Sequence, residues 1–255
     1  MRIVSHTCSN TEIVCALGAA ELLVGVDADS DHPAEIVAGL PKLGRDLSLD
    51  IAAVVALKPD LVLTSRTLPG HDPLVLALEA AGLPTLVCEP LRLADVYADI
   101  ARIAEAIGRA EAGRRLVERL REALKPHPMR GRRPRLLLEW WPKPVITPTR
   151  DSWATELIEL AGGENPWGQR PGKSTPLSDA EIFKAAPDLV VMSWCGVKVE
   201  NYRAELVRRR PGWQDVPAVR RGQIHAISEE FLGRPGPRLV QGYQALRRLI
   251  EAQTQ

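Results

Sequence analysis

One sixteen-residue phrase occurs twice in this chain, and it limits the possible folds more than any other feature. Asp50–Ser65 reads DIAAVVALKPDLVLTS, and Asp179–Trp194 reads DAEIFKAAPDLVVMSW. Each copy has an amphipathic helical segment, a Pro-Asp step, an apolar run and a small polar or aromatic ending. The copies lie about half the chain length apart, whereas solenoid repeats recur every 20–50 residues or so. The repeat therefore predicts two related lobes.

A weaker internal similarity supports the same division. Ser9–Gly18 (SNTEIVCALG) and Ser152–Gly162 (SWATELIELAG) both run from a polar start through a Glu and an apolar stripe to a Gly. Open α/β sheets bind ligands at the carboxyl ends of their strands. If each lobe directs these strand ends toward the other, the functional site is expected in a cleft between the lobes.

Composition and charge exclude several classes of protein. The chain has 255 residues, 45% hydrophobic and 25% charged, which suits two modest globular cores. A formal net charge of +1 gives no overall field for nucleic acid or an anionic membrane. The basic stretches Arg130–Arg135 and Arg208–Arg210 lack interleaved aromatics and are interpreted as solvated loops. No apolar run is long enough to cross a bilayer. We predict neither nucleic-acid binding nor direct membrane insertion.

The N-terminus and the cysteines bear on the compartment. The opening MRIVSHTCSN enters a strand at once, without the cationic segment and apolar stretch of a secretory signal. We predict a cytoplasmic location for a native chain of this length, and an extracytoplasmic or periplasmic one if a signal was trimmed. The four cysteines have no Cys-x-x-Cys spacing and are interpreted as small buried fillers in a reducing compartment: Cys8, Cys15, Cys88 and Cys195.

Strand–helix alternation predicts the fold class, an α/β protein with two doubly wound, Rossmann-like lobes. In the first half, strands are expected at 2–5, 22–26, 61–64 and 85–88, and helices at 9–18, 50–57 and 73–81. Ser9 and Glu12 have the spacing of a capping box at the start of the first helix. In the second half, strands are expected at 135–139 and 224–227 and helices at 153–160 and 238–251, and the repeated phrase at 179–194 is expected to add a helix followed by a strand.

The two lobes are expected to be joined by one long helix. Residues 93–124 have a helical pattern almost throughout, which only Gly108 and Gly113 interrupt. We predict an N-terminal α/β lobe at residues 1–91, a connecting helix at 92–126 and a C-terminal α/β lobe at 127–255, with a linker at 126–134. A continuous helix of about 30 residues would span roughly 45 Å and would resist bending, so little lobe motion is expected.

All six tryptophans lie between residues 140 and 213. Trp141, Trp153 and Trp194 occupy expected strand ends or a helix start, where large flat side chains could pack against a broad, partly apolar ligand. We assign these three to a ligand pocket. Trp213, in a Pro-Gly-Trp turn, is assigned to the core.

The remaining candidate ligand contacts are mostly polar. In the first lobe they lie in the loop 5–9, at positions 45–46 and at the end of the repeated strand, and they suit hydrogen bonds to amides or carboxylates: Cys8, Arg45, Asp46, Ser65 and Arg66. Arg45 and Arg66 fit ordinary surface positions equally well. In the second lobe the candidates form an expected loop after the last strand, which Pro235-Gly236-Pro237 stiffens: Glu229, Phe231 and Arg234, next to Glu230.

Three segments carry a resemblance to a known family. RIVSHTCSNTEIVCALG, LDIAAVVALKPDLVLTS and LGRPGPRLVQGYQAL resemble the helical-backbone (class III) substrate-binding proteins of ABC importers for cobalamin, iron–siderophores and haem. The resemblance covers essentially the whole chain and is strongest to cobalamin-binding members, whose C-terminal region similarly runs Arg-Pro-Gly-Pro-Arg-Leu. It implies a non-enzymatic protein that captures a corrinoid-like ligand between two lobes, in connection with an ABC permease.

The resemblance also implies roles for particular positions. Aromatic residues at strand ends flank the corrin in the family, and an acidic–arginine loop borders it; the matching positions are Ser65, Trp194, Glu229 and Arg234. Two positions depart from the pattern. Cys8 stands where members commonly have Pro, and Ser65 stands where the known cobalamin binder has Trp. The first lobe has no Trp or Phe, so stacking would come mainly from the second.

Two further binding functions and one enzymatic function remain as alternatives. An iron–siderophore or haem receptor would need several convergent arginines for an anionic complex. An intracellular corrinoid sensor or carrier would bind the same ligand without an importer. An enzyme would have to use Cys8 and His6, which lie on the same side of an extended segment. No second His or acid is placed near this pair by sequence spacing, so neither a metal site nor a resident cofactor is predicted.

Docking onto an importer in this family uses one acidic side chain on the outer edge of each lobe. The candidates are Asp72 or Glu79 in the first lobe and Glu200 or Glu205 in the second. Surface acids are abundant, so each of these residues also fits a plain solvated position.

Overall fold

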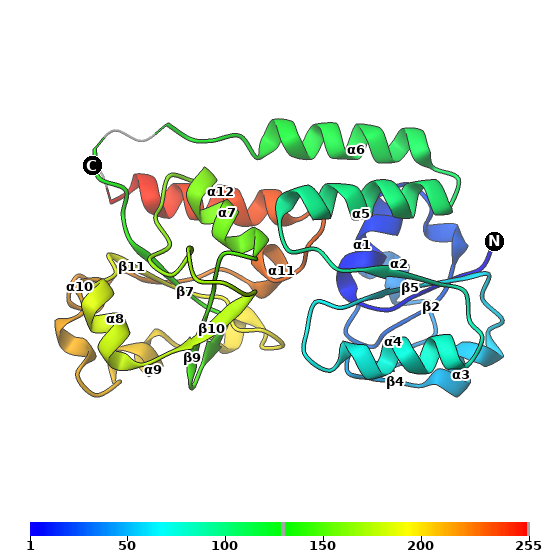
Figure 1. Ribbon diagram of the computed structural model, residues 1–255, viewed down its shortest axis with the longest axis horizontal. Helices are drawn as coiled ribbons and strands as arrows, with labels where there is room; N and C mark the ends of the chain where they lie inside the picture. Colours follow the sequence, from blue (N-terminus) through cyan, green and yellow to red (C-terminus); the bar gives the residue numbers. More distant parts are fainter. Residues whose placement is uncertain (129–130, 254–255) are drawn as a thin grey trace. The chain divides into compact units, whose positions relative to one another are not determined.

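The computed structural model describes residues 1–128 and 131–253, and it divides into two compact units (Figure 1). Unit 1 comprises residues 1–90 and 94–120, and unit 2 comprises residues 91–93 and 121–255. The predicted linker 126–134 and basic stretch Arg130–Arg135 extend into residues 129–130, which lie outside the described residues. Free thiols are found at all four cysteine positions, although only Cys88 is fully buried.

Unit 1 is built on a parallel sheet with the strand order β2-β1-β5-β6. Its strands are β1 (Ile3–Ser5), β2 (Leu23–Val26), β5 (Leu61–Ser65) and β6 (Thr85–Cys88). The connections contain α1 (Cys8–Ala16), a 3-10 turn (Ala20–Leu22), α2 (Ala34–Val37), the hairpin β3 (Gly44–Arg45) and β4 (Ser48–Leu49), α3 (Ile51–Ala56) and α4 (His71–Ala80). The central strands are entirely or almost entirely buried, as expected for a parallel sheet that is covered on both faces.

The first helix starts differently from the prediction. Helix α1 begins at Cys8, and its N-cap Thr7 makes no side-chain capping bond. The Ser9 hydroxyl lies 3.3 Å from the Thr7 hydroxyl. The expected capping box of Ser9 and Glu12 is therefore not the start of this helix.

The segment predicted as one connecting helix is two helices. Helix α5 (Leu93–Ala106) and helix α6 (Ala110–Ala123) are separated at Gly108, whose φ of +70° is accessible to Gly but costly for other residues. The two helices pack so closely that a Cβ added at Gly113 would lie only 2.4 Å from the Cβ of Ala104. Figure 1 shows the two helices running antiparallel. The argument that a single 45 Å rod limits lobe motion therefore does not hold for this chain.

Unit 2 contains a parallel sheet with the order β12-β11-β7 and an antiparallel sheet with the order β10-β9-β8. The strands are β7 (Leu136–Glu139), β8 (Trp141–Pro142), β9 (Val145–Pro148), β10 (Ser174–Leu177), β11 (Leu189–Met192) and β12 (Ile224–Ala226). Its helices are α7 (Trp153–Leu160), α8 (Asp179–Ala185), α9 (Ala204–Arg208), α10 (Pro217–Arg220), α11 (Glu229–Leu232) and α12 (Leu239–Glu251), with 3-10 turns at Val199–Asn201 and Trp213–Asp215. The antiparallel sheet was not predicted.

The two copies of the repeated phrase form the same structure. In each copy a capped helix, α3 or α8, leads to an inner strand of its parallel sheet, β5 or β11. The residue before the Pro-Asp step has a left-handed backbone in both copies, with φ of 47° at Lys58 and 45° at Ala186. This conformation costs about 1–2 kcal/mol for a residue with a Cβ, so the same strained turn persists in both units.

The repeated Pro-Asp step fixes the neighbouring strand. The Asp60 carboxylate accepts the backbone N–H of Arg2 at 2.6 Å, and the Asp60 N–H donates to the Arg2 carbonyl at 2.8 Å. Asp188 makes the same pair of bonds with Arg135, at 2.8 and 2.7 Å. Each aspartate therefore holds the residue at the start of the adjacent parallel strand, β1 or β7, and so helps to set the register of the sheet.

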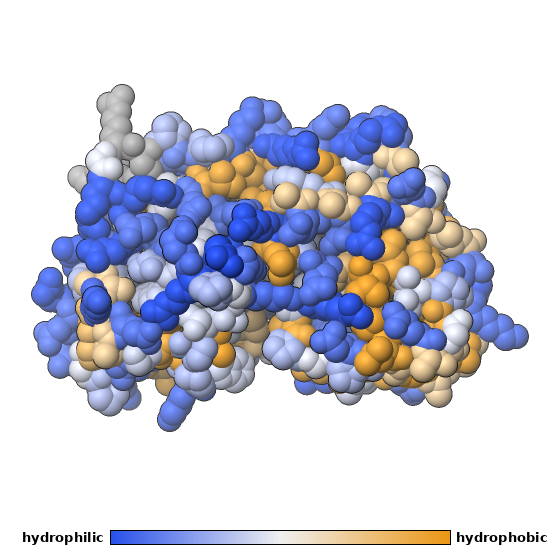
Figure 2. Space-filling model, in the orientation of Figure 1, coloured by the Kyte–Doolittle hydropathy of each residue, from blue (hydrophilic) through white to orange (hydrophobic). Residues whose placement is uncertain are grey.

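One face of the molecule is predominantly hydrophilic. Polar side chains cover most of the face in Figure 2, and apolar patches interrupt them. Among the helices in the described parts of the chain, none combines the length and apolar character needed to cross a membrane.

Candidate functional site

The carboxyl edge of the unit 1 sheet is a network of small polar side chains. Ser65 ends β5 and is only 2% exposed. Its hydroxyl lies 3.1 Å from the Thr7 hydroxyl and accepts a hydrogen bond from the Asn10 amide at 3.2 Å. These bonds hold the start of α1 against β5. Ser65 is therefore engaged inside unit 1, which differs from the expected hydrogen bond to a ligand.

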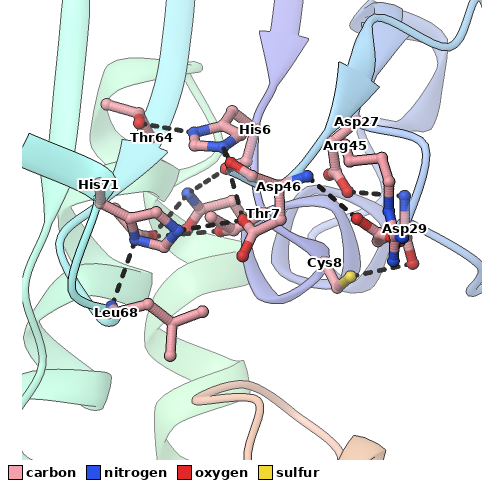
Figure 3. Close-up of polar contacts among 12 residues, drawn as sticks. His6, Thr7, Cys8, Asp27, Asp29, Arg45, Asp46, Thr64, Leu68 and His71 are labelled. Carbon is pink, nitrogen blue, oxygen red and sulfur yellow. Dashed lines mark hydrogen bonds and ion pairs between the residues drawn. The ribbon is translucent and has the colours of Figure 1, made fainter. Parts of the chain in front are cut away.

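Three other candidates in unit 1 meet at Asp29, a residue that the sequence analysis did not single out (Figure 3). The Cys8 thiol donates to the Asp29 carbonyl at 3.0 Å. The Arg45 guanidinium pairs with the Asp29 carboxylate at 3.1 Å, and the Asp46 N–H donates to it at 3.0 Å. Asp29 lies in the polar segment DADSDHP that follows β2, and this strand-end position was the available signal for it.

Arg66, directly after β5, pairs with Asp72 in the first turn of α4 at 3.1 Å. The Asp72 side chain is 74% exposed. Arg66 is a predicted ligand contact and Asp72 is a predicted docking residue. The two predicted roles therefore fall on the two partners of one ion pair. Glu79, Glu200 and Glu205 are also exposed, and Glu205 pairs with Arg208 one helical turn away. These docking assignments stay predictions.

Sequence spacing placed no second His or acid near His6, but the folded chain brings one of each beside it. Asp46, in the turn of the β3–β4 hairpin, and His71, the first residue of α4, both lie beside it, and one ligand atom of each of the three falls within 4.8 Å of the others. The three residues come from separate parts of the sequence, so no local spacing could have joined them. Burial lowers the pKa of His6, although the charges of Asp46 and Asp27 oppose the effect, and the ring is neutral at neutral pH.

Both ring nitrogens of His6 are occupied. Nδ1 lies 2.8 Å from the Thr64 hydroxyl, and Nε2 lies 2.7 Å from the Asp46 carbonyl. A carbonyl only accepts, so Nε2 carries the proton and Nδ1 accepts from Thr64. This ring is consequently not poised as a base for the Cys8 thiol, which counts against the enzymatic alternative.

The tryptophans of unit 2 differ in exposure, and two of the three pocket assignments need correction. Trp194 is 3% exposed; its ring packs 5.2 Å from that of Tyr202, and its indole N–H donates to Glu139 at 3.3 Å. Trp153 is 6% exposed and donates to the Leu232 carbonyl at 2.8 Å. Neither ring offers a free face, because each is packed within unit 2.

Trp141 is the pocket candidate that keeps an open surface. Trp141 lies in β8 and is 42% exposed to solvent. Its indole N–H donates to the Lys143 carbonyl, which orients the ring. Trp140, at the end of β7, is half-buried and packs 6.2 Å from Trp153. The assignment of Trp213 to the core is confirmed, since it is fully buried.

A buried ion pair that the sequence analysis missed underlies this edge of unit 2. Glu139, the last residue of β7, is fully buried and pairs with Arg210, which also stacks 4.4 Å over the Trp213 ring. A Glu at the end of an apolar strand, LLLE, was the only local sign of it. The pair and the Trp194 hydrogen bond together fix the loop that follows β11.

The acidic–arginine segment is partly helical, whereas a loop was expected. Glu229–Leu232 is a short helix, α11, directly after β12. Arg234 pairs with Glu229 at 3.3 Å, and Arg238 pairs with Glu230 at 3.0 Å while lying 5.5 Å from the Phe231 ring. Burial and the nearby Glu229 charge raise the pKa of the Cys195 thiol to about 12, which places Glu229 beside the residue that follows Trp194.

The arginines at these edges are matched by carboxylates. The pairs are Arg45–Asp29 and Arg66–Asp72 in unit 1, and Arg210–Glu139, Arg234–Glu229 and Arg238–Glu230 in unit 2. Because each named arginine has an acidic partner, these positions carry little net positive charge. Such an environment suits a nearly neutral ligand with amide groups better than a multiply charged anion.

Comparison with known proteins places the chain among solute-binding proteins. The periplasmic binding protein family matches residues 3–230. An uncharacterized ABC transporter substrate-binding lipoprotein of Bacillus subtilis (strain 168) is 28% identical, over 99% of this chain and 81% of the relative. A vitamin B12-binding protein of Yersinia pestis (strain Pestoides F) is 26% identical, over 96% and 84%. The apo structure of a periplasmic heme-binding protein from Roseiflexus sp. RS-1 superposes with a TM-score of 0.84 at 26% identity, over 100% and 99% of the two chains.

Proposed function

Because the chain belongs to the periplasmic binding protein family, we propose that it captures a corrinoid of the cobalamin type and delivers it to an ABC permease. The family establishes the coarser statement, that the chain is a substrate-binding protein of ABC transporters and not an enzyme. The identity of the ligand and of the permease are parts of the proposal. An intracellular carrier without a permease remains the alternative from another class.

The observation that carries the choice of ligand is the charge balance of the candidate residues. A siderophore complex or haem brings carboxylates or other anionic groups, which need unpaired arginines. In this chain Arg234 and Arg238 are already paired with Glu229 and Glu230, and their side chains are each only 11% exposed. Cobalamin presents a broad apolar face and many neutral amides, which paired polar side chains can bind without a net positive site.

Apolar surface is available for such a ligand in each unit. Trp141 supplies it in unit 2, where it is 42% exposed. In unit 1, Leu47 follows Asp46 in the hairpin turn and is 54% exposed, and Leu68 lies three residues after β5 and is 41% exposed. These leucines offer apolar surface in a unit that has no Trp or Phe, and Ser65 stands where the family resemblance has an aromatic residue.

The proposal is tested by isothermal titration of the full chain with cyanocobalamin. We expect one ligand per chain, and we expect Trp141→Ala to weaken binding about 5- to 150-fold, the equivalent of about 1–3 kcal/mol for a lost aromatic contact. Phe183→Ala is the matched control, because Phe183 is also 42% exposed but lies on α8, away from the strand ends.

The outcomes separate the alternatives. If ferrichrome or haemin binds and cyanocobalamin does not, the ligand belongs to the second candidate class, the iron–siderophores and haem. Equal losses in Trp141→Ala and Phe183→Ala would show that Trp141 is not a specific ligand contact. Co-purification with a permease would distinguish the importer component from a carrier, and charge reversal at Asp72 and Glu205 would test the docking surface.

A further inference from the structure

Unit 1 contains a cluster of potential metal ligands that the proposed function does not use. His6 follows β1, Asp46 lies in the β3–β4 turn, and His71 begins α4 (Figure 3). The Asp46 carboxylate oxygen Oδ1 lies 3.5 Å from His6 Nε2 and 3.1 Å from His71 Nε2. Both histidines are fully buried. Two imidazoles and a carboxylate therefore converge on one small volume.

The far side of each ring is held in place. His6 Nδ1 is bonded to the Thr64 hydroxyl, and His71 Nδ1 accepts the Leu68 N–H at 3.4 Å. The opposite nitrogens, both Nε2, then carry protons that point toward the carbonyl or carboxylate of Asp46. Metal-binding histidines are commonly oriented by donating the proton of the ring nitrogen that does not bind the metal. The Thr64 hydroxyl can accept such a bond from His6 Nδ1, whereas the Leu68 N–H can only donate to His71 Nδ1.

We propose that His6, Asp46 and His71 bind a divalent transition-metal ion, with Zn²⁺ as the reference cation. Two imidazoles and one carboxylate are a ligand set of catalytic zinc sites, in which a fourth position is left to water or another ligand. Ligands about 2.1 Å from a tetrahedral Zn²⁺ lie about 3.4 Å apart. The two Asp46–histidine separations, 3.1 and 3.5 Å, are already close to that value.

The ion would replace the two Nε2 protons that now face Asp46. One ring nitrogen of each histidine lies within 4.8 Å of a ring nitrogen of the other, so the two imidazoles would need to approach by no more than about 1.4 Å to reach tetrahedral spacing. The Asp46 side chain is 24% exposed and gives the ion a route from solvent. Cys8 is not part of this set, because its thiol is directed to the Asp29 carbonyl.

Metal binding has one structural consequence at His71. When Nε2 binds a metal, the neutral ring carries its proton on Nδ1, which can no longer accept the Leu68 N–H. That bond is the longest in the cluster, at 3.4 Å, and so the least costly to lose. Binding is therefore coupled to a rearrangement of residues 66–70, the segment that holds Arg66 and the exposed Leu68.

The test uses the full chain after removal of metal with a chelator, followed by titration with Co²⁺ and Zn²⁺. We expect one Co²⁺ per chain with the intense visible absorption of tetrahedral coordination, displacement of Co²⁺ by Zn²⁺, and a rise in melting temperature with Zn²⁺. His6→Gln, His71→Gln and Asp46→Asn should each weaken binding by about 100-fold or more, and Thr64→Val by about 10- to 100-fold through the lost orienting bond.

His225→Gln is the control, because His225 lies on β12 in unit 2 and should leave metal affinity unchanged. The proposal is overturned if the wild-type chain binds no Co²⁺ at micromolar concentration. It is also overturned if the His6 and His71 variants keep the wild-type stoichiometry and spectrum. Since the first result needs only the wild-type chain, a variant that fails to fold does not leave the question open. Corrinoid binding is measured separately, so failure of one proposal is distinguishable from failure of the other.

Discussion

The two copies of the repeated phrase have the same backbone but place different chemistry at the ends of their strands. In unit 1 the copy ends at Ser65, which joins a network of hydroxyl and amide groups with Thr7 and Asn10. In unit 2 it ends at Trp194, which packs against Tyr202 and bonds to Glu139. The helix, the left-handed residue and the Pro-Asp step are retained because they build the sheet, whereas the last residue is free to change.

The comparison is tested most strongly at the two strand ends. We expect Trp194→Ala to lower the free energy of unfolding of unit 2 by about 3–5 kcal/mol, because it removes a large side chain from a packed core. Ser65→Ala should cost only about 1 kcal/mol in unit 1, the value of a small hydrogen-bonded group. All six tryptophans lie in unit 2, so urea unfolding followed by tryptophan fluorescence reports on unit 2.

Amide hydrogen exchange in β1 and β5 gives the corresponding value for unit 1. A loss of less than about 1 kcal/mol for Trp194→Ala would show that this side chain is not the structural element that its burial indicates. In that case a direct role of Trp194 in ligand binding would be restored.

The two aspartates that hold the neighbouring strands, Asp188 in unit 2 and Asp60 in unit 1, should also differ in their contribution to stability. The larger contribution is again expected in unit 2. Asp188 is 6% exposed, and besides the Arg135 N–H it binds the Arg132 guanidinium through both carboxylate oxygens, at 2.8 and 2.9 Å. Asp188→Ala is expected to cost about 2–3 kcal/mol, because it leaves charged and backbone donors without their acceptor. The Asp60 side chain is 57% exposed, so Asp60→Ala should cost at most about 1 kcal/mol. Equal losses in the two units would contradict this account.

The Asp188 contribution should depend on pH. Burial alone would raise the pKa of Asp188, but the hydrogen bonds and charges of Arg132 and Arg135 outweigh burial and hold the pKa below its usual value. A carboxyl group with a lowered folded-state pKa stabilises fully above its unfolded pKa, about 3.9, and loses that contribution as the pH falls through the folded value. The stability difference between wild type and Asp188→Asn should be constant from pH 7 to about pH 5 and should shrink below about pH 4. A difference that persists unchanged at pH 3 or below would be inconsistent with an ionised Asp188.

The smallest expected effect concerns the left-handed residues. Lys58→Gly and Ala186→Gly relieve a conformation that disfavours a Cβ, but each glycine also increases the freedom of the unfolded chain. We expect a net stabilisation of about 0.5 kcal/mol for each, similar in the two copies because their φ angles differ by only a few degrees. Destabilisation of one copy and stabilisation of the other would show that the two turns are not equivalent.

Local patterns in the sequence predicted most of the scaffold. The repeated phrase gave α3, β5, α8 and β11, and the buried apolar runs gave the other parallel strands, because side-chain periodicity and helix caps act within a few residues. In the sequence, Gly108 and Gly113 both interrupted the helical pattern, and neither showed whether the helix ends there. The answer depends on the packing of Gly113 against Ala104, which is a tertiary contact.

The chemistry of the strand ends was less predictable. The cluster of His6, Asp46 and His71 joins residues 25 to 65 positions apart, and their proximity follows from the sheet order rather than from spacing. The burial of Trp153 and Trp194 likewise depends on partners such as Leu232 and Tyr202 from other segments. The sequence can place a residue at the end of a strand, but it does not show whether the side chain points to solvent or packs into the core.

The most direct test of the proposed function is a competition in which the purified chain is dialysed against an equimolar mixture of cyanocobalamin, haemin and an anionic ferric tris-catecholate siderophore. Native mass spectrometry then identifies what the protein retains. The balanced arginine–carboxylate pairs predict that one cyanocobalamin per chain is retained and that the two other ligands are lost. Retention of haemin or the ferric tris-catecholate instead of cyanocobalamin would contradict the account.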